Sequence, residues 1–256
     1  MEPQTKRRST LKEMIELLMR VIFTVCGFIA IAFVLIITVY LIISGLPAIR
    51  EIGLVDFLFG TRWASTDKTN PAYGILPFIL TSIYGTAGAI LIGVPIGFMA
   101  AVFLSKVAPP KVAAVIRPAV DLLAGIPSVV YGLVGMMVLV PWIKDTFDLK
   151  AGDSLLAAIL ALAVMILPSI ISVSETALKA VPKEYEEASL ALGNTHIGTI
   201  FKVLVPAAKS GILAGVILGV GRAVGETMAV VMVCGNKVQF PQLLKSVQPL
   251  TSGVVL

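Results

Sequence analysis

Long apolar stretches separated by short charged ones dominate this sequence of 256 residues. Five stretches of more than 20 residues contain no charged residue, or only two in the case of the last. A helix needs about 20 apolar residues to cross the hydrocarbon core of a bilayer. The pattern therefore predicts five membrane spans, at about 21–45, 73–104, 120–142, 154–174 and 210–234.

The second apolar stretch is ambiguous because its uncharged run, 69–105, has 37 residues. It could hold one tilted span after an interfacial segment, or two spans broken near Pro95. Lysine and arginine favour the cytoplasmic side of a membrane. With a cytoplasmic N-terminus, one span leaves twelve basic residues inside and seven outside, whereas two spans would move the basic cluster of 106–117 outside. We therefore expect one span here and a cytoplasmic tail at 1–19.

Composition supports a multi-pass membrane protein. Hydrophobic residues make up 57% of the chain and charged residues 14%, whereas a soluble domain carries about a quarter charged residues. The fold class predicted is an all-α helix bundle in a lipid bilayer. The net charge of +5 does not indicate nucleic-acid binding, because no basic patch is interleaved with aromatic residues. The run 21–49 is longer than a signal-peptide core and lacks an Ala-x-Ala cleavage site, so we expect it to remain as an anchor.

The end of the sequence carries an expectation of its own. Five spans would put the C-terminus outside the cytoplasm, and the final residues, LTSGVVL, bring neither a closing helix nor a charged tail. We therefore expect one transmembrane domain over 20–256, in which five spans are visible and a sixth is missing.

Glycines four residues apart occur in two of the spans. They are Gly93 and Gly97 in the second span, and Gly211, Gly215 and Gly219 in the fifth. This spacing lets helix backbones approach closely in lipid. We therefore expect tight helix contacts along these two spans.

The longest cytoplasmic connection, 175–209, is predicted to contain two short amphipathic helices. The first should end at Gly193-Asn194, a common helix stop and turn. The second should begin after a cap at Asn194 or Thr195 and stop before Pro206. On this evidence alone, the connection could simply be a solvated link between two spans.

A family resemblance appears in this connection. The segment Glu187-Ala188-Ser189, followed after three intervening residues by Gly193 and then by Val203-Leu204-Val205-Pro206, resembles the EAA loop of ABC importer permeases of the MetI-like type. Ser189 replaces the usual second alanine, and Val203 and Val205 replace isoleucine and leucine. The resemblance implies that Glu187, Ala188, Ser189, Gly193 and Pro206 belong to a loop that docks in a cleft of a separate cytoplasmic ATPase. Small residues suit a deep fit in a groove, and Glu187 could pair with a basic residue across the interface.

Two charged residues lie within the last apolar stretch. Arg222 falls near mid-membrane, where an arginine costs about 2.5–3.5 kcal/mol on insertion scales. Glu226 is four residues further on, which would place both side chains on one face of a continuous helix. One interpretation is an internal ion pair that fixes packing. The other is that Arg222 faces a path for an oxyanion, which suits its planar fork of donors, while Glu226 holds it in place.

A second resemblance favours the path. GRAVGETMAVVMVCGN (221–236) and DLLAGIPSVVYGLVG (121–135) resemble the PstC-type permease subunits of the bacterial high-affinity phosphate importer. That resemblance implies that Arg222 and Glu226 take part in phosphate passage across the bacterial inner membrane. It also implies the partners: an ATP-binding subunit dimer, a second homologous permease and an extracytoplasmic phosphate-binding protein.

The sequence predicts a transport subunit and no enzyme, with no cofactor. It lacks a G-x-x-x-x-G-K-[ST] loop, so ATP hydrolysis would belong to another chain. His196 is the only histidine, and no cluster of ligands around it indicates a metal site. An intramembrane enzyme is disfavoured because no H-E-x-x-H motif or paired intramembrane aspartates occur. The remaining alternative is an ion-gradient-driven anion transporter that works without an ATPase and uses Glu226 to carry a proton.

Overall fold

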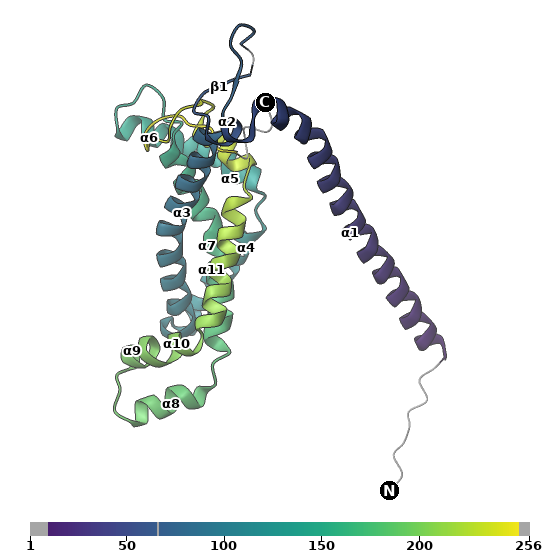
Figure 1. Ribbon diagram of the computed structural model, residues 1–256. Coiled ribbons are helices and arrows are strands. Elements are labelled where there is room, and N and C mark those ends of the chain that lie inside the picture. Colours follow the sequence, from purple (N-terminus) through teal and green to yellow (C-terminus); the bar gives the residue numbers. More distant parts are fainter. Residues whose placement is uncertain (1–9, 66, 251–256) are drawn as a thin grey trace. The chain divides into compact units, whose positions relative to one another are not determined.

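The computed structural model describes residues 10–65 and 67–250 and is built almost entirely of helices (Figure 1). It divides into two units, Met1–Phe57 and Leu58–Leu256. The basic residues at 6–8 and the final residues 251–256, on which the expectation of a missing sixth span rests, lie outside the described residues. The helices and strands are α1 (Thr10–Ile52), α2 (Leu54–Phe59), β1 (Trp63–Ala64), β2 (Ala72–Tyr73), α3 (Leu76–Val102), the π-helical segment η1 (Phe103–Val107), α4 (Pro110–Gly125), α5 (Ser128–Val134), the π-helical η2 (Gly135–Leu139), α6 (Val140–Thr146), α7 (Leu155–Lys179), α8 (Lys183–Ala191), α9 (His196–Thr199), the π-helical η3 (Ile200–Leu204), α10 (Val205–Ala207), α11 (Lys209–Val224) and α12 (Met228–Cys234).

The first unit consists mainly of α1, a helix of 43 residues. Its apolar side chains from Met14 to Leu46 are exposed within the chain. An apolar helix with no packed face is stable only where lipid or protein covers it. Gly53 follows the helix with φ +90°, a conformation that glycine adopts without strain.

The second unit is a helix bundle built around α7. This helix buries 15 of its 25 residues, and α3, α4, α11 and α12 pack against it. The predicted glycine stripes form two of these contacts: a Cβ atom at Gly93 would lie 2.7 Å from Ile166 Cδ1, and one at Gly219 would lie 2.9 Å from Ile170 Cγ1. The glycines therefore let α3 and α11 approach α7 closely, as their spacing predicted.

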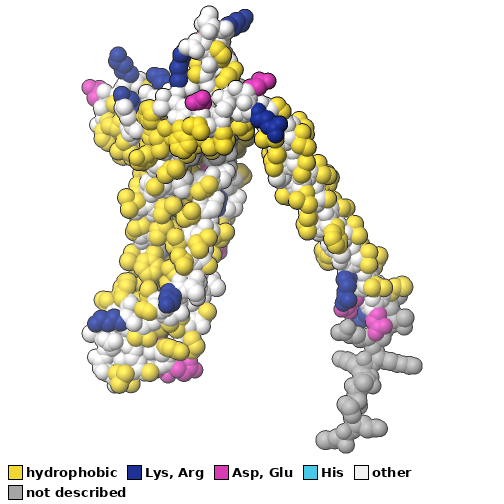
Figure 2. Space-filling view, in the orientation of Figure 1, with side chains coloured by type: hydrophobic (Ala, Val, Ile, Leu, Met, Phe, Trp, Pro, Cys, Tyr) yellow, Lys and Arg dark blue, Asp and Glu magenta, His cyan; other side chains and the backbone are white. Residues whose placement is uncertain are grey.

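The bundle has the surface of a membrane protein. In Figure 2, hydrophobic side chains cover the middle of the second unit, whereas charged side chains gather towards its two ends. Among the described residues, four helices are long and apolar enough to cross a membrane, or five if the bent pair His196–Ala207 and Lys209–Val224 counts as one span. The second span is a single unbroken helix, Leu76–Val107.

The third and fifth spans differ from the sequence expectation. Residues 120–142 do not form one helix: α4 ends at Gly125, and α5 begins at Ser128. Pro127 explains this break, because a proline disfavours the helical conformation of the residue before it, and Ile126 is extended with ψ 127°. In the fifth stretch, 210–234, α11 ends at Val224 and α12 starts only at Met228.

A short β-hairpin precedes α3. Trp63 pairs with Tyr73 across the two strands and packs edge-to-face on Phe78 of α3, with 5.4 Å between ring centroids. In the hairpin loop, Asp67 accepts hydrogen bonds from the Thr69 hydroxyl (2.7 Å), the backbone N–H groups of Thr69 and Asn70, and Arg62. The Thr69 hydroxyl is the largest of the causes that lower the pKa of Asp67 below its ordinary value.

Candidate functional site

The region predicted to dock on a partner forms a compact helical hairpin, residues 183–207. Its helices α8 and α9–α10 lie beyond the ends of α3 and α11 (Figure 1). Gly193 makes the turn with φ +85°, a conformation for which glycine is best suited. The Thr195 hydroxyl then accepts a hydrogen bond from Gly198 N at 3.1 Å and caps α9. The turn and the cap agree with the sequence prediction.

The end of the second helix of this helical hairpin differs from the sequence prediction. We expected it to stop before Pro206, but it continues through α10 to Ala207. The π-helical segment η3 precedes Pro206 in this helix. In a π-helix, backbone hydrogen bonds join residues that are five positions apart. The chain then bends by 73° into α11, and the residue at the bend, Ala208, has φ −89° and ψ 3°. Pro206 itself is exposed on the hairpin.

The residue that departs from the usual motif lies inside the hairpin. Ser189 is 7% exposed, and its Oγ lies 2.9 Å from Thr199 Oγ1. It also accepts a hydrogen bond from Asn194 Nδ2 at 3.2 Å. Ser189 therefore joins α8 to α9, a bond that an alanine there could not make.

Its neighbours on α8 face outward. Glu187 and Ala188 are exposed, and Leu192 is 89% exposed. A groove beside them is lined by Tyr185, Ala188, Ser189, Leu192, Gly193, Asn194 and Val203. Three of the five residues predicted to couple to an ATPase thus line one groove. An exposed apolar side chain beside a groove suits a protein partner.

Ion pairs that the sequence did not predict connect the hairpin region with the spans. Glu186, the neighbour of the exposed Glu187, binds Lys106 of η1 with a Nζ–Oε2 distance of 2.8 Å. His196 Nε2 lies 3.8 Å from the other oxygen of Glu186. The adjacent glutamates therefore differ: Glu186 connects α8 to the end of α3–η1, whereas Glu187 is exposed on the surface.

A second cluster lies at the same end of the bundle. Glu175 of α7, which is 7% exposed, binds Arg117 of α4 at 2.5 Å and Lys179 at 2.6 Å. Arg117 also donates to the backbone carbonyl of Leu104 at 3.0 Å. A buried carboxylate needs such partners, because an unpaired charge is strongly disfavoured there. The cluster holds α4, α7 and η1 together where they meet the hairpin.

The two charged residues of the last apolar stretch do not share one helix. Arg222 is half-buried near the end of α11. Glu226 lies in the break between α11 and α12, where its Oε1 accepts a hydrogen bond from Ala229 N at 2.9 Å. A carboxylate is favourable at this end of a helix. The expected alignment of both side chains on one helical face is therefore wrong.

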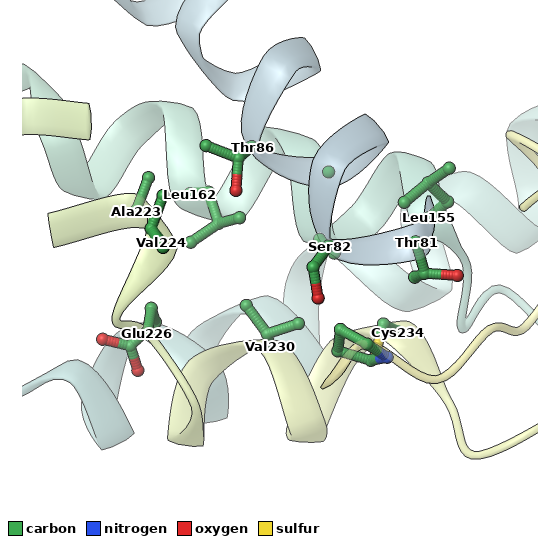
Figure 3. A pocket seen from close by; sticks show the side chains of 13 residues that line it. Thr81, Ser82, Thr86, Leu155, Leu162, Ala223, Val224, Glu226, Val230 and Cys234 are labelled. Atoms are coloured by element: carbon green, nitrogen blue, oxygen red, sulfur yellow. The ribbon is translucent and has the colours of Figure 1, made fainter. Parts of the chain in front are cut away.

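Glu226 instead lines a pocket between α3, α7, α11 and α12. Its volume is about 20 Å³, and Figure 3 shows the side chains that line it. Three hydroxyl residues of α3, namely Thr81, Ser82 and Thr86, contribute to the wall. Ala223 and Val224, which follow Arg222 in the chain, also line it.

Comparisons with known proteins identify the class. Residues 93–248 match the family described as "Binding-protein-dependent transport system inner membrane component". The chain belongs to this family, whose members are multi-pass permease subunits of ABC transporters in the inner membrane; they are not enzymes themselves, and the ATPase is a separate chain.

The chain is similar to individual relatives and to a solved structure. The chain is 44% identical to "Probable ABC transporter permease protein YqgH" of Bacillus subtilis (strain 168), over 87% of this chain and 72% of that protein. It is 36% identical to "Phosphate transport system permease protein PstC" of Xylella fastidiosa (strain 9a5c), over 84% of this chain and 72% of that protein. A solved structure of the MetNI methionine ABC transporter in inward-facing conformations matches 59% of this chain and 68% of its own, with 24% identity and a TM-score of 0.46.

Proposed function

We propose that this permease subunit conducts inorganic phosphate into a bacterial cell, driven by a separate ATPase. An extracytoplasmic phosphate-binding protein would deliver the anion, and a second homologous permease would complete the pore. The similarity to a relative named as a phosphate transport permease supports the substrate. The N-terminus would be cytoplasmic, as the distribution of basic residues favours.

The observation that carries the substrate proposal is an arginine within an apolar helix. Arg222 stands near the end of α11, in the last apolar stretch, and remains half-buried. Intramembrane arginines are rare and commonly mark ion pathways, and the planar guanidinium offers paired donors to an oxyanion. Glu226, four residues on, lines a cavity beside the same helix end. The pair would provide an attractive charge and a nearby polar wall along the route.

Substitution of Arg222 tests this proposal. Phosphate uptake by membranes that carry the full importer should be lost in Arg222→Ala. Arg222→Lys should retain part of it, because lysine keeps the charge but not the planar fork. Unaltered uptake in both variants at matched expression would remove Arg222 from the pathway.

The 183–207 hairpin would be the contact with the ATPase. The face of the hairpin that carries Glu187, Leu192 and the groove would dock in a cleft of the partner. Closure of the ATPase dimer would then move the hairpin. The Lys106–Glu186 pair and the 73° bend into α11 would pass this movement to the spans. We therefore assign Glu187, Ala188 and Gly193 to the docking surface, and Ser189 to the internal bracing of the hairpin.

A further inference from the structure

We propose that Thr199 is a positioning residue that carries the movement of α8 to the spans, through a buried hydrogen-bond network with Ser189 and Asn194. This inference rests on the proposed function, in which the ATPase docks on α8. It adds the route by which the docked helix moves the rest of the bundle. Ser189, Asn194 and Thr199 are called the hairpin network below.

The helix that would receive the ATPase is anchored by one buried residue. All nine residues of α8 lie in the described range, and only Ser189 among them is buried. The salt bridge from Glu186 to Lys106 adds a second attachment, which leads to the end of α3–η1. A force on α8 moves another helix only through contacts that resist separation. Ser189 is therefore the buried link between α8 and the second helix of the hairpin.

Ser189 is held by two hydrogen bonds from the second half of the hairpin. Its Oγ lies 2.9 Å from Thr199 Oγ1, and Asn194 Nδ2 donates to it at 3.2 Å. Thr199 is 0% exposed. A buried hydroxyl cannot exchange a lost partner for water, so removal of the Thr199 hydroxyl would weaken the attachment of Ser189.

Thr199 is followed by residues that belong to the core. Ile200 is 1% exposed and Leu204 is 0% exposed, and both pack in one cluster with residues from the ends of α3 and α7 and from the start of α11. The other buried members of this cluster are Val102, Leu178, Val181 and Ala208. A close-packed apolar cluster transmits displacement because it is hardly compressible. Thr199 therefore lies between the docking helix and the cluster at which these spans meet.

The hairpin network also forms part of the groove on the docking face. Ser189 and Asn194 line this groove together with Leu192 and Val203. A side chain of the ATPase that enters the groove would press directly on the network. The network would then move α9 and η3 together with α8, so that the hairpin turns as one body.

The test uses the full importer in proteoliposomes, with both permeases, the ATPase and the binding protein. The measured quantity is radiolabelled phosphate taken up per ATP hydrolysed. Thr199→Val keeps the side-chain shape without the hydroxyl and should lower this ratio about two- to fivefold, whereas Thr199→Ser keeps the hydroxyl and should retain it. A purely structural role would lower the amount of assembled importer, and so uptake and hydrolysis together, without changing the ratio.

Hydrogen exchange followed by mass spectrometry gives a readout that does not depend on the transported ion. In the unsubstituted importer, a non-hydrolysable ATP analogue should change the exchange of amides in α8, in η3 and in the first turn of α11. In Thr199→Val the change should remain in α8 and be lost in η3 and α11, while the α8 amides exchange about five- to thirtyfold faster. Thr176→Val is the control, because the exposed Thr176 donates its hydroxyl to Ser172 O within α7 at 2.8 Å, and it should behave as the unsubstituted importer.

The double variant of Ser189→Ala with Thr199→Val tests whether both hydroxyls act through one contact. Its ratio of phosphate to ATP should be no lower than that of the weaker single variant, because both changes remove the same bond. Additive losses, an unchanged ratio in Thr199→Val, or equal losses in Thr199→Val and Thr199→Ser would overturn the role of Thr199.

The outcomes separate this route from the proposed function. ATP-driven uptake that is undiminished in Glu187→Lys would contradict docking of the ATPase on α8. Uptake that is lost in Glu187→Lys, together with the full ratio in Thr199→Val, would leave the docking intact and contradict only the route through Thr199.

Discussion

The salt bridge between Lys106 and Glu186 should hold α8 against the end of α3–η1. Glu186→Gln removes the charge and keeps the shape of the side chain. The two side chains are 14% and 24% exposed, and their polar atoms are 2.8 Å apart. Hydrogen bonds to charged groups contribute about 1.5–3 kcal/mol, whereas exposed ion pairs contribute about 0–1 kcal/mol. For this partly buried pair we expect a contribution of about 1–2 kcal/mol to the free energy that holds α8 in place.

A loss of that size should be visible as local opening of α8. One or two kcal/mol changes an equilibrium by a factor of about 5–30, so the amides of α8 should exchange hydrogen faster by about that factor. Hydrogen exchange followed by mass spectrometry on the full importer measures this directly. The uptake of phosphate per ATP hydrolysed should fall in the same variant, because α8 would follow the ATPase without moving α3.

Glu184→Gln is the matched control, since Glu184 is an exposed acid in the first turn of the same helix. The exchanged pair Lys106→Glu with Glu186→Lys should restore most of the protection. The salt bridge does not hold α8 if the α8 amides exchange hydrogen at the same rate in Glu186→Gln and Glu184→Gln. The same conclusion follows if the variant with both charges swapped does not regain protection while each single variant still inserts.

Two further predictions concern packing and the β-hairpin. Gly93→Ala should destabilise the bundle by about 1–3 kcal/mol, because the new Cβ would lie 2.7 Å from Ile166 Cδ1. Gly221→Ala should not destabilise it, because no atom lies within 4 Å of the new Cβ. Thermal unfolding in detergent compares the two variants, and equal midpoints would contradict the close contact. The lowered pKa of Asp67 means that its bond to Thr69 stabilises the loop fully above the ordinary pKa of 3.8 and is lost as the pH falls through the lower folded value. Exchange of the Thr69 amide, corrected for intrinsic rates, should therefore accelerate only below about pH 3.8, and no such change in the corrected rate would refute the role of Asp67.

Local signals in the sequence predicted the hairpin well. The turn at Gly193 and the cap at Thr195 depend on residues within a few positions of each other, so spacing alone located them. The spacing of the glycines in α3 and α11 likewise predicted close helix contacts, although the sequence could not identify α7 as the partner of both helices.

Other features depend on packing between distant segments. The break at 225–227 could not be predicted, because the apolar pattern continues through it. Only the structure shows that Glu226 accepts a hydrogen bond from Ala229 N of α12 and does not follow Arg222 along one helix. The Lys106–Glu186 contact joins residues 80 positions apart, which no local pattern reveals. The burial of Thr81 likewise became visible only once the packing of α3 against α7 was known.

ATP-driven uptake of radiolabelled phosphate into proteoliposomes that contain the full importer tests the central claim most directly. With ion gradients collapsed by ionophores, uptake should require ATP and should be lost in Glu187→Lys, although the variant inserts normally. Uptake that follows an imposed ion gradient without ATP, and that is undiminished in Glu187→Lys, would contradict ATPase coupling through the hairpin.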